Sequence, residues 1–323
     1  MIYIAGSGVG KAAQKVTNDE LSTIMDTSHD WIYSRTGIAS RFISDNQSTV
    51  DLACLAAHNA LTMSSMAKEE IDLIVVATMT PDYFTPSCAC LVQERLGLNN
   101  QQVMAFDINA ACSGFLYSLQ VVMAMLESKQ YRNALVIGAE VMSKVLNWED
   151  RGTSILFGDG AGALLLSTTT GIPIKRYAHY HGSRGNAAVL QAPALAARPK
   201  FTNAKPELHY LSMDGPEVFR FAVDAMMHCM DRILTAAKQE ISDIDLVIPH
   251  QANVRIIQSV MRKYHIREEQ IFLNLQEYGN TSAASVAIAF ATLQANQRIH
   301  PGMKIILVGF GAGLTWGTTY LEL

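Results

Sequence analysis

The chain has 323 residues, of which 49% are hydrophobic and 17% are charged, and its formal net charge at pH 7 is -4. This length and composition predict a globular protein with one large hydrophobic core or two fused cores of ordinary domain size. The weak negative charge excludes a chain-wide positive field, so we expect neither nucleic acid nor a membrane as a partner.

The cysteines and the first residues indicate a reduced compartment. The number of cysteines is odd and their spacing lacks the paired pattern of zinc ligands, so we expect no metal site. No secretory signal opens the chain, and no apolar run is as long as a bilayer span. We therefore expect a cytoplasmic protein. The five cysteines are Cys54, Cys88, Cys90, Cys112 and Cys229.

Helical and strand patterns alternate through the first half of the chain. The cap signal Thr17-Asn-Asp-Glu20 predicts a short helix through Met25. The remaining patterns predict strands at 1–4, 71–77, 103–106 and 134–138, helices at 51–63 and 115–126, and a further helix beginning near Pro86. This order of elements is typical of an α/β protein.

The second half begins with a stretch of low regularity, residues 179–213, which contains several glycines and prolines. We expect this stretch to be an insertion that acts as a lid or a subunit contact. Beyond it, the patterns predict helices at 219–238 and 286–295 and strands at 244–248 and 305–309.

Two glycine-rich stretches resemble nucleotide-binding motifs without matching them. Gly6-Ser-Gly-Val-Gly-Lys11 has a lysine where the third Rossmann glycine belongs. Gly158-Asp-Gly-Ala-Gly-Ala163 leads into an expected strand, whereas a dinucleotide site needs a helix there. We interpret both stretches as turns.

The two halves of the chain repeat one pattern. In each, a helix leads to an apolar strand with an aspartate near its start, and Asp245 follows Asp72 at an offset of 173 residues (245 − 72). Strands that end at Gly138 and Gly309 repeat at an offset of 171 residues (309 − 138). Chance similarity between apolar strands is the alternative, but the agreement of order and offset favours a duplicated βαβ-type unit.

Cys112 lies between the strand at 103–106 and the helix at 115–126. The free N–H groups and the dipole of a helix start lower the pKa of a thiol, so this position suits a nucleophile. Small neighbours such as Ala111 and Gly114 leave room for a substrate. The alternative is a small buried cysteine with no chemical role.

The repeat also predicts where partners of Cys112 lie. His250 directly follows the strand at 244–248, and Asn280 precedes the helix that corresponds to the one after Cys112. Ligands of open α/β sheets bind beyond the carboxyl ends of the strands, where these residues are expected. Taken singly, such a histidine is often a core residue and such an asparagine is often part of a turn.

Over essentially its whole length, the sequence resembles the β-ketoacyl-acyl carrier protein synthase III family of thiolase-fold condensing enzymes. The resemblance implies a thiolase-like duplicated α/β fold, in which two pseudo-twofold halves at 1–170 and 171–323 form a layered αβαβα core. The first half would carry the nucleophile and the second half the histidine and asparagine. The motifs that carry the resemblance are Trp31-Ile-Tyr-Ser-Arg35-Thr36-Gly-Ile38, Ala110-Ala-Cys112-Ser-Gly-Phe115, Asp150-Arg151-Gly-Thr153, Phe157-Gly-Asp-Gly-Ala-Gly162, His250-Gln-Ala-Asn253, Gly279-Asn280-Thr-Ser-Ala-Ala-Ser285 and Phe310-Gly-Ala-Gly-Leu-Thr-Trp316-Gly317.

By this resemblance, Cys112 takes an acyl group from acyl-coenzyme A, and His250 and Asn280 act on malonyl-acyl carrier protein. Loss of carbon dioxide from the malonyl group leaves an enolate, whose oxyanion needs two fixed hydrogen-bond donors. The backbone N–H groups of Cys112 and Ala312 match the donors to the tetrahedral intermediates. Many relatives have glycine at the second position, and alanine tolerates a positive φ poorly.

The resemblance further implies binding residues for both substrates. Thr85 matches a primer-pocket position that often holds an aromatic ring, so we expect longer or branched primers. A basic surface for the acidic acyl carrier protein is expected at Arg220, Arg255, Arg262 and Lys263. The positions that match coenzyme A contacts are Thr27, Trp31, Arg35, Arg151, Gly215, Phe219, Asn253 and Phe310, with Trp31 and Arg151 on either side of the adenine.

We therefore expect a cytoplasmic, homodimeric acyltransferase that initiates fatty-acid synthesis by decarboxylative condensation of acyl-coenzyme A with malonyl-acyl carrier protein. Coenzyme A thioester is a substrate, and no permanently bound cofactor is expected. Two alternatives stay open: a related condensing enzyme of polyketide or quinolone-type metabolism, and a non-catalytic acyl-binding subunit. The presence of Cys112 argues against the second alternative.

Overall fold

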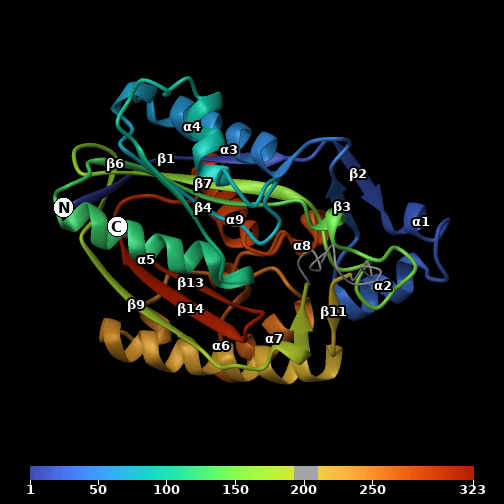
Figure 1. The fold of residues 1–323 in the computed structure, drawn as a ribbon. Coiled ribbons are helices and arrows are strands. Elements are labelled where there is room, and N and C mark those ends of the chain that lie inside the picture. The colour runs from blue at the N-terminus through green and yellow to red at the C-terminus, as the bar shows by residue number, and fades with distance from the viewer. Residues whose placement is uncertain (193–209) are drawn as a thin grey trace.

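A computed structural model describes residues 1–192 and 210–323. Two sheets alternate with three layers of helices (Figure 1). The first sheet has the order β5-β4-β6-β7-β1-β8, and the second has the order β12-β13-β14-β9. The first contains β1 (Ile2–Lys11), β4 (Leu73–Ala77), β5 (Met104–Ile108), β6 (Asn133–Glu140), β7 (Gly160–Ser167) and β8 (Ile172–Ile174), and the second contains β9 (Arg176–Ser183), β12 (Leu246–Pro249), β13 (Lys304–Gly311) and β14 (Thr315–Glu322).

The three helical layers separate the sheets and cover their outer faces. Helices α3 (Thr49–Ser64) and α4 (Cys88–Arg95) cover the first sheet, and α6 (Gly215–Ala237) and α7 (Val254–Tyr264) cover the second (Figure 1). Between the sheets lie α5 (Gly114–Glu127) and α9 (Ala284–Ala295). Residues 284–291 of α9 are all buried, because both faces of this helix contact protein.

Smaller elements complete the described chain. The two-stranded antiparallel sheet of β2 (Gln14–Thr17) and β3 (Ser40–Ile43) lies beside the two-sheet core, and so do the helices α1 (Asn18–Leu21), α2 (His29–Thr36) and α8 (Leu275–Tyr278). Strands β10 (Leu190–Gln191) and β11 (Ser212–Met213) pair with each other. The 3₁₀ turns are η1 (Lys68–Glu70), η2 (Ala111–Ser113), η3 (Met142–Lys144), η4 (Ala187–Val189), η5 (Ile241–Asp243) and η6 (Glu268–Gln270).

The duplicated α/β layering predicted from the sequence is confirmed. Parallel β4 and β6 in the first sheet correspond to parallel β12 and β13 in the second. The two aspartates of the repeat play the same role, because the carboxylate of Asp72 accepts from the Asn133 N–H at 3.0 Å and that of Asp245 accepts from the Lys304 N–H at 2.8 Å. The division at residue 170 stays a prediction, and β8 extends the first sheet to residue 174.

Three local predictions are wrong. The stretch Gly6–Lys11 is part of β1, and Gly160–Ala163 opens β7, although both were expected to be turns. A Cβ atom at Gly8 would collide with the Ala56 carbonyl oxygen, so this glycine lets α3 lie directly on the strand. The expected insertion also starts too early, because residues 179–183 belong to β9; its residues 193–209 lie outside the described part.

Candidate active site

Cys112 lies in the 3₁₀ turn η2, which connects β5 to α5. The turn places the preceding Ala111 at a positive φ of 46°, in the left-handed region that favours glycine. The Thr315 hydroxyl lies 3.1 Å from the Ala110 carbonyl oxygen and 3.0 Å from that of Ala312, so it ties the turn to the loop after β13. Cys112 is only 7% exposed, and its thiol contacts the Ser282 hydroxyl at 3.4 Å.

The expectation that the helix start lowers the pKa of Cys112 is wrong for the free protein. The pKa of this thiol is raised to about 12, chiefly by burial and to a smaller extent by the nearby Glu140 carboxylate. The hydrogen bond to Ser282 acts in the opposite direction but is the smaller effect. Desolvation therefore outweighs the helix dipole, and Cys112 rests as a neutral thiol.

His250 follows β12 and is held from both sides. Its backbone N–H donates to the Val308 carbonyl oxygen at 2.7 Å, and its Nδ1 lies 2.6 Å from the Ser285 hydroxyl. Burial lowers the pKa of the imidazole to about 3, so the ring is neutral at physiological pH. If Ser285 donates to Nδ1, the ring proton lies on Nε2, which makes Nε2 a hydrogen-bond donor.

Asn280 is fixed between α8 and α9. Its backbone N–H donates to the Leu156 carbonyl oxygen at 2.8 Å, and its carbonyl oxygen accepts from the Gly158 N–H at 3.0 Å. The side-chain Oδ1 accepts from the Ser282 N–H at 2.8 Å. Because this contact occupies the oxygen, the Nδ2 amide group remains as a donor.

The three predicted catalytic residues line one cavity of about 160 Å³. Most other lining side chains are apolar, such as Leu156, Phe157, Val218 and Ile256. A neutral imidazole and a neutral amide in such surroundings can donate hydrogen bonds to a developing oxyanion without reacting themselves. The arrangement therefore suits a nucleophilic thiol beside a two-donor oxyanion site.

The residues expected to bind coenzyme A fall into two groups. Gly215, Phe219, Asn253 and Phe310 line the cavity that contains Cys112. Trp31 lies outside that cavity's lining, and two guanidinium groups lie near its ring centroid, that of Arg35 at 4.4 Å and that of Arg151 at 5.0 Å. The Asn253 amide donates to the Arg35 carbonyl oxygen at 3.2 Å and so connects the two groups. Thr27 has a buried hydroxyl without a partner in the described chain.

A second, smaller cavity adjoins Cys112 and Ala312. Ala312 does not adopt the strained positive φ that was expected; in this loop Gly313 does, at 131°. The other lining residues are mainly apolar and include Met79, Met142 and Leu190. Thr85 is exposed and does not line either of these cavities within the described chain, so a primer role inside its own subunit finds no support.

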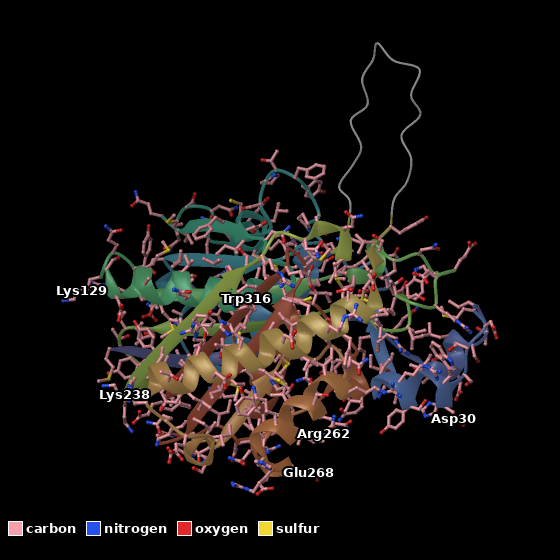
Figure 2. The ribbon with its side chains drawn as sticks, turned by 90° about the horizontal axis from the view of Figure 1, so that it is seen from below. Asp30, Lys129, Lys238, Arg262, Glu268 and Trp316 are labelled. Atoms are coloured by element: carbon pink, nitrogen blue, oxygen red, sulfur yellow. The ribbon has the colours of Figure 1, made fainter. Side chains whose placement is uncertain are left out.

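The four basic residues predicted to contact a carrier protein are exposed. Arg255, Arg262 and Lys263 lie on α7, and Arg262 is on the outer helical layer (Figure 2). Lys263 forms an ion pair with Asp231 at 3.7 Å, and Arg220 forms one with Glu217. Arg255 donates to the Ser34 carbonyl oxygen at 2.9 Å, near the Trp31 group.

Sequence reasoning missed two residues that contact the catalytic groups and a third whose charge acts on Cys112. Ser282 and Ser285 lie in the motif around Asn280, but only the structure shows that one contacts Cys112 and the other His250. Glu140, at the end of β6, carries no sequence signal. No cluster of three metal-ligating side chains occurs in residues 1–192 and 210–323. Nor does any helix there have the length and apolar character needed to cross a bilayer.

Comparisons with known proteins show the family of this chain. Residues 106–181 match the family model of 3-oxoacyl-[acyl-carrier-protein] synthase III, and residues 234–323 match the model of its C-terminal part. The β-ketoacyl-[acyl-carrier-protein] synthase III of Clostridium perfringens is 45% identical over 323 residues, which cover 99% of this chain and 98% of that protein.

Solved structures show the same relationship. The 3-oxoacyl-[acyl-carrier-protein] synthase III of Aquifex aeolicus superimposes with a TM-score of 0.90 at 40% identity and full coverage of both chains, 100% each. A priming β-ketosynthase of a polyketide pathway superimposes with a TM-score of 0.90 at 31% identity, covering 100% of this chain and 96% of its own. The chain therefore belongs to the β-ketoacyl-acyl carrier protein synthase III family of thiolase-fold acyltransferases.

Proposed function

We propose that Cys112, His250 and Asn280 catalyse the decarboxylative condensation of acyl-coenzyme A with malonyl-acyl carrier protein that initiates fatty-acid synthesis. The products are 3-oxoacyl-acyl carrier protein, coenzyme A and carbon dioxide. The observation that carries this assignment is the shared cavity, which brings one thiol and two neutral donors together from three distant parts of the chain.

In the first half-reaction, the Cys112 sulfur attacks the acyl carbonyl carbon and expels the coenzyme A thiolate. The backbone N–H groups of Cys112 and Ala312 stabilise the tetrahedral oxyanion. Their assignment is supported by the loop after β13, since the Thr315 hydroxyl ties this loop to the turn that holds Cys112. The apolar cavity beside Cys112 and Ala312 accommodates the acyl chain.

In the second half-reaction, the malonyl group loses carbon dioxide and becomes an enolate. His250 Nε2 and Asn280 Nδ2 donate hydrogen bonds to its oxygen, and the enolate carbon then attacks the acyl group on Cys112. Losing one donor of such a pair costs about 3 kcal/mol of barrier in comparable oxyanion sites. The contacts of Ser285 with His250 and of Ser282 with Asn280 leave these two groups as donors.

Coenzyme A enters along Gly215, Phe219, Asn253 and Phe310, with its adenine at Trp31. The Arg151 guanidinium already lies 5.0 Å from the Trp31 ring centroid, so an adenine that enters between the two groups displaces it. The carrier protein docks on the basic residues of α7. We further propose a cytoplasmic homodimer without a permanently bound cofactor, in which Thr85 acts on the partner's primer pocket.

Two variants test the assignment by separating the half-reactions. Cys112→Ala is expected to abolish the mass increase that acetyl-coenzyme A produces on the intact protein. Asn280→Ala is expected to retain this acylation and to lose condensation with malonyl-acyl carrier protein by about 10²-fold. An Asn280→Ala protein that condenses at the parent rate would remove this residue from the mechanism. A competition between acetyl-, isobutyryl- and octanoyl-coenzyme A then identifies the preferred primer.

A further inference from the structure

The Cys112 thiol has a buried hydrogen-bond partner that the mechanism above leaves without a chemical role. The thiol donates to the Ser282 Oγ at 3.4 Å, and both side chains are buried. The backbone N–H of Ser282 donates to the Asn280 Oδ1, and this contact holds the residue at a φ of 47°, in the left-handed region. The structure therefore fixes a hydroxyl against the reacting sulfur.

A second buried group, Glu140, lies at the end of β6 and is fully buried. Its Oε2 accepts from the Thr80 N–H at 3.1 Å, from the Thr80 hydroxyl at 2.5 Å and from the Thr78 hydroxyl at 3.1 Å. The Met79 N–H donates to the same carboxylate at 3.2 Å. Ser282 lies close enough to this carboxylate for its hydroxyl to lower the pKa of Glu140.

In the described chain, no lysine or arginine forms an ion pair with Glu140. A buried carboxylate without a cation is costly, because protein dipoles only partly replace its lost hydration. Burial accordingly raises the pKa of Glu140 to about 7 despite its hydrogen bonds. The group can therefore exist with or without a proton near neutral pH.

His250 is a poor base for removing the proton of the Cys112 thiol. Burial lowers the pKa of its imidazole to about 3, and its Nδ1 is occupied by Ser285. The thiol of Cys112 must nevertheless lose its proton when the sulfur attacks a thioester. The Ser282 hydroxyl contacts this thiol and also acts on the Glu140 carboxylate, so it is the group through which a proton can pass between them.

We propose that Ser282 relays the proton of the Cys112 thiol to Glu140, which holds it while the enzyme is acylated. This proposal rests on the assignment of Cys112 as the nucleophile. As the sulfur bonds to the acyl carbon, the S–H bond breaks, its proton moves to the Ser282 oxygen, and the Ser282 proton moves to the carboxylate. The bond from the acyl carbon to the coenzyme A sulfur then breaks, and this thiolate takes a proton from solvent.

The second half-reaction reverses the relay. When the enolate carbon bonds to the acyl group, the bond between that group and the Cys112 sulfur breaks. The Cys112 thiolate recovers its proton from Ser282, which takes one from Glu140. The enzyme thus returns to its starting protonation state, with a neutral thiol and an ionised carboxylate, and each cycle consumes one proton from solvent.

Single-turnover acylation by acetyl-coenzyme A, followed by intact mass, tests the relay. Ser282→Ala and Glu140→Gln are each expected to slow acylation by about 10²-fold, and the double variant is expected to be no slower than the slower single variant. Such non-additivity indicates that the two residues act in one step, because independent structural damage would add. Ser118→Ala is the matched control, since Ser118 is buried in α5 and its hydroxyl has no partner among the described residues.

The Glu140→Gln variant separates the relay from a simple charge effect. The carboxylate charge raises the pKa of Cys112, so removing it would speed acylation if charge were its only influence. Acylation of Glu140→Gln at or above the parent rate would therefore overturn the proposal, as would a parent rate for Ser282→Ala. Failure of the parent protein to become acylated would instead refute the role of Cys112. Thermal melting of each variant confirms that it is folded.

Discussion

The backbone of Gly311 lies directly against Cys112. A Cβ atom placed on Gly311 would come within 2.7 Å of the Cys112 amide nitrogen and 3.0 Å of its Cβ. The end of β13 therefore positions the turn that carries the thiol and the N–H group assigned to the oxyanion site. This contact depends on the absence of a side chain at residue 311.

Gly311→Ala is accordingly expected to displace Cys112 and to reduce acyl-enzyme formation by at least about 10-fold, because small misplacements of reacting groups cost large factors in rate. The measurement is the rate of the acyl mass increase at saturating acetyl-coenzyme A. Gly185→Ala serves as the control, since nothing lies within 4 Å of a Cβ atom at that position. Equal acylation rates in the two variants would show that the Gly311 contact is not needed.

Ser285→Ala tests the orientation of the His250 ring. The hydroxyl lies 2.6 Å from Nδ1, and its loss frees the ring to adopt the other tautomer, in which Nε2 carries no proton. We expect acylation of Cys112 to persist and carbon dioxide release from malonyl-acyl carrier protein to fall by about 10-fold, which corresponds to roughly 1.4 kcal/mol. Normal decarboxylation by this variant would mean that Ser285 does not set the tautomer.

The site residues that could be predicted are those marked by local sequence patterns. Cys112 and its flanking strand and helix follow local patterns, and so does the repeat that identified His250 and Asn280. Glu140, Ser282 and Gly311 act through contacts between distant parts of the chain, and no local pattern records those contacts. The glycines of β1 were misread as a turn for the same reason. Glycine is needed there because the backbone of α3 leaves no room for a Cβ atom.

The pKa of Cys112 was predicted in the wrong direction because the sequence shows a helix start but not its burial. Thr85 is exposed on a loop of its own subunit, so its primer role stays a prediction that involves the partner subunit. The error for Cys112 concerns the surroundings of the residue rather than its identity. The element order, by contrast, follows from hydrophobic periodicity, which the sequence records directly.

Two partly buried histidines on β9 are expected to make stability depend on pH. Burial lowers the pKa values of His179 and His181 to about 4 from an ordinary value of 6.5. Tyr117 and Tyr177 contact them, and neither tyrosine supplies a negative charge near neutral pH. The unfolded chain therefore binds more protons than the folded chain between about pH 6.5 and 4, and the free energy of unfolding falls as the pH falls through this range.

Denaturant unfolding at pH 7 and pH 5 measures this effect, which we expect to be on the order of 2 kcal/mol per histidine at most. His181→Phe removes one titrating group and should make the stability less sensitive to pH. Replacement of the exposed His58 by asparagine should leave the pH dependence of the parent protein in place. An unaltered pH dependence in His181→Phe would contradict the assignment.

The basic residues of α7 are expected to differ in how strongly they bind the carrier protein, because some of them already form ion pairs within the chain. Lys263 already forms an ion pair with Asp231, whereas Arg262 contacts only the Ser259 hydroxyl among the described polar groups, at 3.2 Å. An unpaired surface cation interacts more strongly with an approaching acidic protein, since no neighbouring carboxylate offsets its charge. Arg262→Glu is therefore expected to raise the KM for malonyl-acyl carrier protein by about 10-fold at low salt, and Lys263→Glu to raise it less.

Acylation by acetyl-coenzyme A should stay at the parent rate in both variants, and the difference in KM between them should shrink as salt screens the surface charges. Equal KM values for Arg262→Glu and the parent protein at low salt would place the carrier-protein surface elsewhere on the molecule.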